Sequence, residues 1–431
     1  MAVPGDVLLA LSVLGLAILF ALLGGGFWLL WLHVRLRRAG MEAERALLAR
    51  ALPSDADLPD VCVQLPVFNE GAIVQRAVRS AAGLDWPRGK LHIQVLDDST
   101  DDTAEYARAA AAEFPGLDIQ VLHREDRAGF KAGALAAGMA ALPRCQYFAI
   151  LDADYMPAPD FLRLTMRPLL FEPKLAFAQA RFDYLNAEAN ELTRVQALML
   201  DGHLGVEQAT RSWAGHPLPF NGTCGIWRRA AVEAAGGWRG DTLAEDLDLS
   251  YRAWLAGWRG TFLVSVAVPG ELPDERRAWV AQQRRWAKGS GEVARRMAHV
   301  LRGAWRFGPT GFFGALLHLG QWWSTPILVL TALVAVAAGI IHPSAGPSLA
   351  VAGIVLALGA EVQAFLYWRL GNRLLRMPPL SWPRLIGRGL MLQTLGARLL
   401  LRNITGIVEA IFARQSVFQR TPKRGVSGPG Q

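Results

Sequence analysis

The stretch YFAILDAD, residues 147–154, decides the fold class. It is a short apolar run that ends in two aspartates. Three β-rich runs of the same kind precede it, VCVQLPV (61–67), LHIQVLD (91–97) and LDIQVLH (117–123). Alanine-rich stretches with helical character, such as residues 72–83 and 133–142, lie between these runs. Strands that alternate with helices predict an α/β domain built on a parallel sheet.

Acidic residues follow several of these predicted strands. Asp97 and Asp98 close the second strand, Asp152 and Asp154 follow the fourth, and PVFNE (66–70) ends the first. Ligands of parallel sheets bind beyond the carboxyl ends of the strands. A single aspartate there can be only a helix N-cap, but acids at three strand ends predict a binding site.

The pair Asp152 and Asp154 predicts a metal site. In an extended segment, positions i and i+2 point to the same side. Two carboxylates on one side can hold Mg²⁺, which takes one or two protein carboxylates together with phosphate oxygens. No P-loop and no G-x-G-x-x-G follows the first strand, which disfavours P-loop kinases and dinucleotide oxidoreductases. The acids therefore indicate a metal with a different phosphate-bearing ligand, such as a diphosphate leaving group.

Three further residues extend this site. Lys131 opens a helix after the third strand, where a lysine and a helix N-terminus both favour anions; the alternative is a solvated surface lysine. Glu245 and Asp246 begin another predicted helix. Acids at that position are favoured by the helix dipole alone, or one of them is a general base that takes a proton from an attacking hydroxyl.

The stretch QQRRWAKGS, residues 282–290, lies in a helical segment that begins near residue 275. Gln282, Arg285 and Trp286 share one helix face. An amide, a guanidinium and an indole suit a sugar-and-phosphate site. Arg284 and Lys288 point elsewhere and are expected to meet lipid headgroups. The alternative is an amphipathic helix that lies at the membrane surface as a whole.

Composition indicates a membrane protein with a substantial soluble part. Of 431 residues, 52% are hydrophobic and 19% are charged, and the formal net charge is +8. Much of the positive charge flanks apolar segments, which fits a partner surface of anionic lipid. Acidic residues are abundant in the soluble part, so we expect no nucleic-acid partner. The three cysteines are widely spaced, which fits a reducing compartment.

Apolar segments predict where the chain meets the membrane. Residues 7–32 form a run that is long enough to span, and the arginines that follow it place that end in the cytoplasm. Residues 311–341 and 347–370 predict two more spans. Residues 390–412 contain Arg398, Arg402 and Glu409, which favours a helix lying on the membrane.

These segments give a domain plan. We expect a transmembrane anchor (1–34), a linker helix (35–58), a cytoplasmic catalytic domain (59–306), two transmembrane helices (307–372) and an interfacial helix with a tail (373–431). The predicted location is the cell (inner) membrane, with several passes.

The acids and QQRRW, taken in order, resemble the D, DxD, (T/E)D, QxxRW signature of processive family 2 glycosyltransferases. One segment is most similar to the cellulose-synthase-like mannan and glucomannan synthases. It is residues 220–253, FNGTCGIWRRAAVEAAGGWRGDTLAEDLDLSYRA. The likeness covers roughly residues 60–425. It implies a GT-A fold and Mg²⁺ or Mn²⁺ as cofactor.

The resemblance also implies roles for individual residues. The residues implied in nucleotide binding are Phe68, Glu70, Asp97, Asp98 and Lys131. Those implied in metal binding are Asp152 and Asp154. Asp246 would be the base, with Glu245 beside it. The acceptor and diphosphate would meet Phe220, Asn221, Gly222, Thr223, Gln282, Arg285 and Trp286. VFQRTPKRG in the tail resembles a gating-loop motif through Phe418, Thr421 and Lys423.

The implied activity is transfer of a hexose from GDP-mannose or UDP-glucose to a growing β-glycan, with inversion. Two alternatives stay open. One is a glycolipid synthase of the ceramide glucosyltransferase type, and the other is a membrane scaffold without activity. Three spans are few for a closed glycan channel, so we expect that the chain is short, forms a homo-oligomer or does not translocate its product.

Overall fold

The computed structural model describes residues 4–412, apart from the side chains of residues 297, 298, 322, 398 and 401. The chain divides into two compact units. The sheet unit comprises residues 36–197 and 211–282, and the helical unit comprises residues 4–35, 198–210 and 283–412. Residues 198–210 and the second half of the QQRRW helix thus group with the apolar helices. The domain bounds expected from the sequence remain a prediction.

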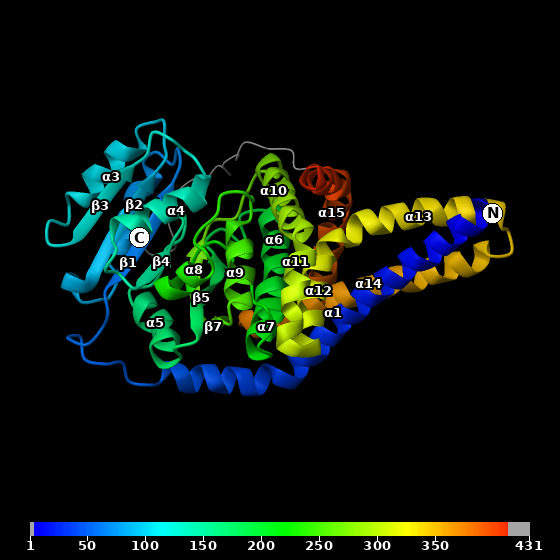
Figure 1. Cartoon of the computed structure of the whole chain (residues 1–431), viewed down its shortest axis with the longest axis horizontal. Coiled ribbons are helices and arrows are strands. Elements are labelled where there is room, and N and C mark those ends of the chain that lie inside the picture. The colour runs from blue at the N-terminus through cyan, green and yellow to red at the C-terminus, as the bar shows by residue number, and fades with distance from the viewer. Residues whose placement is uncertain (1–3, 413–431) are drawn as a thin grey trace. The chain divides into compact units, whose positions relative to one another are not determined.

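The sheet unit is built on seven strands in the order β3-β2-β1-β4-β6-β5-β7 (Figure 1). Their bounds are β1 Val61–Val67, β2 Leu91–Asp97, β3 Asp118–His123, β4 Tyr147–Ile150, β5 Leu175–Tyr184, β6 Gly225–Arg228 and β7 Arg259–Gly270. The four strands predicted from the sequence are present. Every residue of β2 is buried, as the near-continuous apolar pattern of a central parallel strand requires.

One strand departs from the parallel arrangement that the sequence predicted. β6 pairs antiparallel with both β4 and β5, while all other pairs are parallel. An antiparallel strand begins at the edge where its parallel neighbours end. The loop before β6, residues 220–224, therefore lies at the carboxyl edge of the sheet.

The helices of this unit are α2 Ile73–Ala82, α3 Thr103–Ala111, α4 Phe130–Ala141, α5 Phe161–Phe171, α8 Arg229–Ala234, α9 Glu245–Leu255 and a 3₁₀ turn, η1 Arg88–Lys90. Apolar residues of α2, α3 and α5 form one core with the strands. α4 packs on β1 and β2 through small residues. A Cβ on Gly138 would stand 2.5 Å from Gln64 Nε2, so α4 needs glycine there to lie this close to the sheet.

Four helices have residues in both units. They are α1 Pro4–Leu48, α6 Glu191–Gly202, α7 Ala209–Trp213 and α10 Arg276–Arg295. α1 is continuous across the predicted boundary between anchor and linker at residue 34. α6 continues into a π-helical segment, η2 His203–Gln208, and then into α7 Ala209–Trp213.

The remaining helices of the helical unit are α11 Met297–Ala304, α12 Gly308–Gly320, α13 Ser324–Ile341, α14 Gly346–Leu375 and α15 Trp382–Ile411, with 3₁₀ turns η3 Trp305–Phe307 and η4 Gln321–Trp323. Three helices are long and apolar enough to cross a membrane, Gly5–Leu48, Ser324–Ile341 and Gly346–Leu375. Gln363 of α14 donates a hydrogen bond to Leu23 O of α1 at 2.8 Å, so two of them are joined directly.

The second predicted span, residues 311–341, is divided by η4 into α12 and α13. α15 covers the stretch expected to lie on the membrane and is not among the three candidate spans. The gating-like residues Phe418, Thr421 and Lys423 lie outside the described residues.

Candidate active site

The carboxyl edge of the sheet brings together the loops that the sequence singled out. Cys224 donates its N–H to Ile150 O at 2.8 Å, and Asp152 donates its N–H to Thr223 Oγ1 at 2.9 Å. The loop before β6 is thereby fixed to the loop after β4. The antiparallel strand, which sequence reasoning missed, is the element that places residues 220–224 at the site.

Four predicted site residues form one cluster. Lys131 Nζ donates to Asp152 Oδ1 at 2.5 Å and to Gly222 O at 3.0 Å. A Cβ built on Gly222 would lie 3.2 Å from Asp246 Oδ2 and 3.8 Å from Lys131 Nζ. α4, the β4 loop, the loop before β6 and the start of α9 therefore converge on one point. We call these four residues the lysine–aspartate cluster.

Asp246 has an unusual protonation equilibrium. Burial raises the pKa of its carboxyl to about 7, and repulsion from Glu245 adds to the rise. The N–H of Leu247, which donates to Asp246 Oδ1 at 2.8 Å, and the charge of Lys131 oppose this shift. A carboxyl with a pKa near 7 is matched to proton transfer at neutral pH.

Lys131 remains a cation in this setting. Burial lowers the pKa of its ammonium group, but attraction to Asp152, Glu245 and Asp246 outweighs burial and raises the pKa above the ordinary value. Its side chain is 23% exposed. The site thus keeps one positive charge among several carboxylates.

Buried polar side chains hold the loop before β6. Gln179 of β5 donates to Thr223 O at 3.0 Å and accepts the N–H of Asn221 at 3.0 Å. Ser250 of α9 accepts the N–H of Phe220 at 2.8 Å and donates to Asp246 O at 2.6 Å. Ser250 therefore links the loop to the residue with the raised pKa.

The predicted acceptor residue Phe220 lies in the core. Its ring is 1% exposed and packs edge-to-face on Phe177 and Trp227. The backbone of residues 221–223, and not this ring, faces the lysine–aspartate cluster.

Asp97 and Asp98 lie in a second cluster at the ends of β2 and β3. Asp97 is fully buried and accepts hydrogen bonds from Ser99 N–H at 3.1 Å and from His123 Nδ1 at 2.5 Å. The guanidinium of Arg124 donates one hydrogen bond to each carboxylate oxygen of Asp98, at 2.7 and 2.6 Å. Both acids are thus tied to the residues that follow β3.

Phe68 has a cationic partner in this second cluster. The guanidinium of Arg127 lies 3.3 Å from the ring centroid of Phe68 and 3.9 Å from Asp98. Glu70 follows on the same loop and is partly buried. A ring with a guanidinium over it forms a flat surface of the kind that binds planar groups.

Sequence reasoning missed His123, Arg124 and Arg127. The available indication was HREDR (123–127), in which His123 ends the third strand and two arginines follow it, next to a strand that ends in acids. It also missed Gln179 and Ser250, which are indicated only by a polar residue within a buried strand and by a serine one turn after Asp246.

Strained backbone concentrates in these loops. Among the described residues, the non-glycine residues with positive φ are Asn69 at 54°, Phe130 at 49° and Cys224 at 59°. All three lie at the carboxyl edge of the sheet, in the loops that carry the predicted site. Such strain persists where the surrounding structure holds it, and it is common at functional sites.

The aspartate pair expected to hold a metal is not in an extended segment. β4 ends at Ile150, and Tyr155 N–H donates to Asp152 O at 3.1 Å in a turn. Asp154 is 5% exposed, while the Asp152 side chain is 36% exposed. The two acids supply carboxylate oxygens, the ligands that hard divalent cations prefer, so the donor types fit an ion that takes its other ligands from a diphosphate and water. Among the described residues, no group of three or more His, Cys, Asp or Glu side chains is gathered to hold an ion.

Gln282, Arg285 and Trp286 lie on α10, as predicted. Gln282 belongs to the sheet unit, and Arg285 and Trp286 belong to the helical unit. Trp286 is 37% exposed, and a large exposed aromatic side chain is suited to stacking.

The opposite face of α10 corrects the expectation that Arg284 and Lys288 meet lipid headgroups. Arg284 donates to Glu409 of α15 at 2.6 Å. Lys288 is 2% exposed, with its Nζ 3.8 Å from Glu409 and 4.0 Å from Glu292. Both cations pair with Glu409 of α15, and Lys288 is in addition buried, so it does not face lipid headgroups.

Comparisons with known proteins agree with this geometry. A family model described as "Glycosyl transferase family group 2" matches residues 147–360. Glucomannan 4-beta-mannosyltransferase 2 of Arabidopsis thaliana is 42% identical over 247 residues, which cover 56% of this chain and 46% of the relative. Glucomannan 4-beta-mannosyltransferase 1 of Oryza sativa subsp. japonica is 43% identical over 244 residues, with 56% and 47% covered. The chain spans about half the length of these relatives.

A solved structure shares the fold. Mannosyltransferase PcManGT from Pyrobaculum calidifontis, determined in complex with GDP-Man and Mn²⁺, is 22% identical with a TM-score of 0.58, and the match covers 93% of this chain and 100% of that one. The mixed sheet with its single antiparallel strand is a GT-A fold, as the sequence resemblance implied. This chain is thus similar to the plant glucomannan 4-beta-mannosyltransferases at 39–44% identity over slightly more than half of its length, and residues 147–360 match the family group 2 glycosyl transferase model.

Proposed function

We propose that this protein is a membrane-bound inverting glycosyltransferase that adds hexose from a nucleotide diphosphate sugar to a growing β-1,4 glycan. One observation carries the proposal. Asp246, a carboxyl with a pKa near 7, lies next to Gly222 and Lys131 in a cluster that also holds Asp152. The cluster combines a base with a cationic site for phosphate.

The nucleotide would bind at the ends of β1 and β2. Phe68 and Arg127 offer a flat surface for the base, and Asp98 holds the guanidinium of Arg124 beside it. Glu70 lies on the same loop as Phe68 and would border the nucleotide, and Asp97 would support this surface from the core.

The diphosphate would bind at Lys131 and at the N-terminus of α4, which both favour anions. Asp152 and Asp154 would hold Mg²⁺ or Mn²⁺ there. When bound, such an ion neutralises charge on the leaving diphosphate.

Asp246 would take the proton from the acceptor hydroxyl. The hydroxyl oxygen then forms the new bond to the anomeric carbon. The bond from that carbon to the phosphate oxygen breaks, and its electron pair leaves with the diphosphate. Glu245 contributes by raising the pKa of Asp246, which keeps the base near the working pH.

The acceptor would lie against the backbone of residues 221–223 in the sheet unit. The family resemblance adds Gln282, Arg285 and Trp286 of α10 as residues with acceptor or diphosphate roles. The indole of Trp286 is suited to stack on a pyranose, and the guanidinium of Arg285 is suited to a phosphate. These roles follow from the family resemblance and from the shared face of α10.

Mannose is the favoured hexose, because the curated relatives at 42–44% identity are glucomannan 4-beta-mannosyltransferases; glucose is the competing donor sugar. We place the sheet unit in the cytoplasm, because three arginines follow the N-terminal candidate span at Arg35, Arg37 and Arg38. The location in the cell membrane is part of the same proposal.

The test uses membranes that contain the full chain and labelled GDP-mannose or UDP-glucose, with Mn²⁺ or with a chelator. We expect label from GDP-mannose in polymer that an endo-β-1,4-mannanase digests, and we expect the chelator to abolish it. Label that partitions into organic solvent would instead assign the chain to glycolipid synthesis. No transfer from either donor would support the inactive scaffold.

A further inference from the structure

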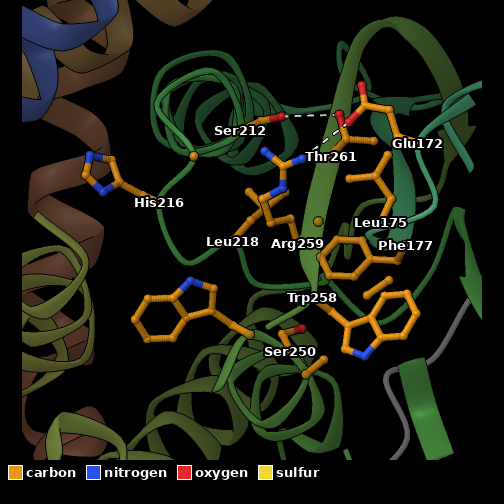
Figure 2. Close-up of a pocket in the computed structure, with 15 residues that line it drawn as sticks. Glu172, Leu175, Phe177, Ser212, His216, Leu218, Ser250, Trp258, Arg259 and Thr261 are labelled. Carbon is orange, nitrogen blue, oxygen red and sulfur yellow. Dashed lines mark hydrogen bonds and ion pairs between the residues drawn. The ribbon is translucent and has the colours of Figure 1, made fainter. Parts of the chain in front are cut away.

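A cavity of about 210 Å³ lies in the sheet unit at the end opposite the acids. It is bordered by the first residues of β5 and β7 and by the second half of α9 (Figure 2). The lysine–aspartate cluster lies at the other ends of these strands, so this cavity is not part of the donor site.

The lining of the cavity is aromatic on one side. Phe177, Trp254 and Trp258 contribute rings. Phe177 and Trp254 are 1% and 7% exposed, whereas Trp258 is partly exposed and has the ammonium of Lys174 5.9 Å from its ring centroid. Trp258 therefore offers a ring that a ligand can reach.

The polar lining carries little net charge. Ser212 and Thr261 present hydroxyls 3.4 Å apart, and Arg259 lies 3.7 Å from Glu172; Figure 2 shows the Arg259 side chain reaching toward both Thr261 and Glu172. Burial, together with repulsion from Arg211, lowers the pKa of His216 to about 4, so its imidazole is neutral at physiological pH. This chemistry suits a neutral ligand with many hydroxyls and disfavours a phosphate.

We propose that this cavity is an accessory site for a single pyranose ring, which stacks on Trp258 and exchanges hydrogen bonds with Ser212, Thr261 and the Arg259–Glu172 pair. The volume supports one ring, because pockets that enclose drug-sized ligands measure about 300–1,000 Å³. The ring comes either from a free monosaccharide or from the end of a glycan. The assignment goes beyond the transferase activity and does not depend on it.

Two residues that line the cavity also contact the loop before β6. Ser250 lines the cavity, accepts the N–H of Phe220 and donates to the carbonyl of Asp246. Phe177 lines it as well and packs on the ring of Phe220. A bound pyranose would thus contact the side chains that hold the loop before β6.

The test is saturation-transfer NMR on the full chain in detergent micelles, with mannose in one arm and mannohexaose in the other. We expect transfer to ring protons in at least one arm, with the arm that responds identifying the source. Trp258→Ala should weaken this binding at least tenfold, and Trp258→Phe, which keeps a ring, should weaken it less. Tyr106→Ala removes a 40% exposed aromatic of the same unit outside the cavity and should leave binding unchanged.

Trp286→Ala separates this site from the proposed acceptor site, where the indole of Trp286 would stack on the glycan. Binding that persists in Trp286→Ala but is lost in Trp258→Ala supports the accessory site. Binding that is equal in the parent and in Trp258→Ala, or absent from both arms, overturns it, and neither result bears on the transferase assay. Melting curves of both Trp258 variants show whether a loss of binding reflects loss of the fold.

Discussion

Asp246 is the general base of the proposed mechanism, and its raised pKa gives a testable pH dependence. A base is active only when it is deprotonated. We expect kcat/KM for the donor to rise about tenfold per pH unit below pH 7 and to level off above it, because the carboxyl titrates at about 7. Initial rates measured from pH 5 to 9 test this. A profile that is flat between pH 5 and 7 would rule out Asp246 as the titrating base.

The same raised pKa predicts that the folded state loses stability at neutral and higher pH. Below about pH 4, Asp246 is protonated in both the folded and the unfolded chain and adds no pH dependence. From about pH 4 to 7 the unfolded chain loses this proton while the folded chain keeps it, so stability falls as pH rises. Asp246→Asn removes this penalty, which is at most about 4 kcal/mol. The variant should melt several degrees above the parent at pH 8 and close to it at pH 4, as scanning fluorimetry would show.

Gly222 tests the close approach between the loop before β6 and the base. Its φ is +80°, and a Cβ there would lie 3.2 Å from Asp246 Oδ2. Gly222→Ala should lose roughly 1–2 kcal/mol of stability from backbone strain and should also lower kcat at least tenfold by displacing the carboxylate.

Gly237 supplies the matched control. It has φ +76° with nothing within 4 Å of its Cβ position. Gly237→Ala should incur the same strain and keep its kcat. Equal kcat values for the two variants would mean that the close approach of Gly222 to Asp246 does not contribute to catalysis.

At the scale of single elements, the sequence predicts most of the sheet but not the direction of every strand. The four strands before residue 151 are apolar, β-rich and separated by helices, so their parallel pairing follows from their order. β6 spans only Gly225–Arg228 and lies within a motif-rich stretch, and nothing in four residues specifies antiparallel pairing. That direction is set by tertiary contacts, such as Cys224 N–H to Ile150 O.

The pairing of α10 with α15 predicts the effect of removing Glu409. Glu409→Ala would remove the acid that lies 3.8 Å from the nearly buried Lys288 and is bound by Arg284. We expect a loss of about 1–3 kcal/mol, the usual cost when a buried charged group loses a partner. Thermal melts in detergent measure this.

Glu42→Ala removes the acid of a solvent-exposed pair, since Arg38 and Glu42 are 91% and 56% exposed. Exposed pairs contribute about 0–1 kcal/mol, so this variant should melt close to the parent. If Glu409→Ala shifts the melting temperature no more than Glu42→Ala does, the ion pairs between α10 and α15 do not stabilise the helical unit.

For the whole molecule, the sequence predicted the class of protein and the proximity of four predicted site residues. Lys131, Asp152, Gly222 and Asp246 were named from motif order and do lie together. The burial of the Phe220 ring and the binding of Arg284 and Lys288 to Glu409 were not predictable. The spacing of residues along a helix or strand indicates which side chains share a face. It does not indicate which other helix or ring packs against that face in the folded protein.

The most direct measurement of the central claim is transfer of labelled mannose by the full chain and its Asp246→Asn variant, at pH 8 and saturating donor. Asp57→Asn changes an exposed aspartate before the amino end of β1 and is the control for a simple change of charge. Loss of a general base lowers rates by roughly 10²–10⁴-fold, so we predict at least a hundredfold lower kcat for Asp246→Asn and an unchanged kcat for Asp57→Asn. An Asp246→Asn variant that works within twofold of the parent would contradict the account.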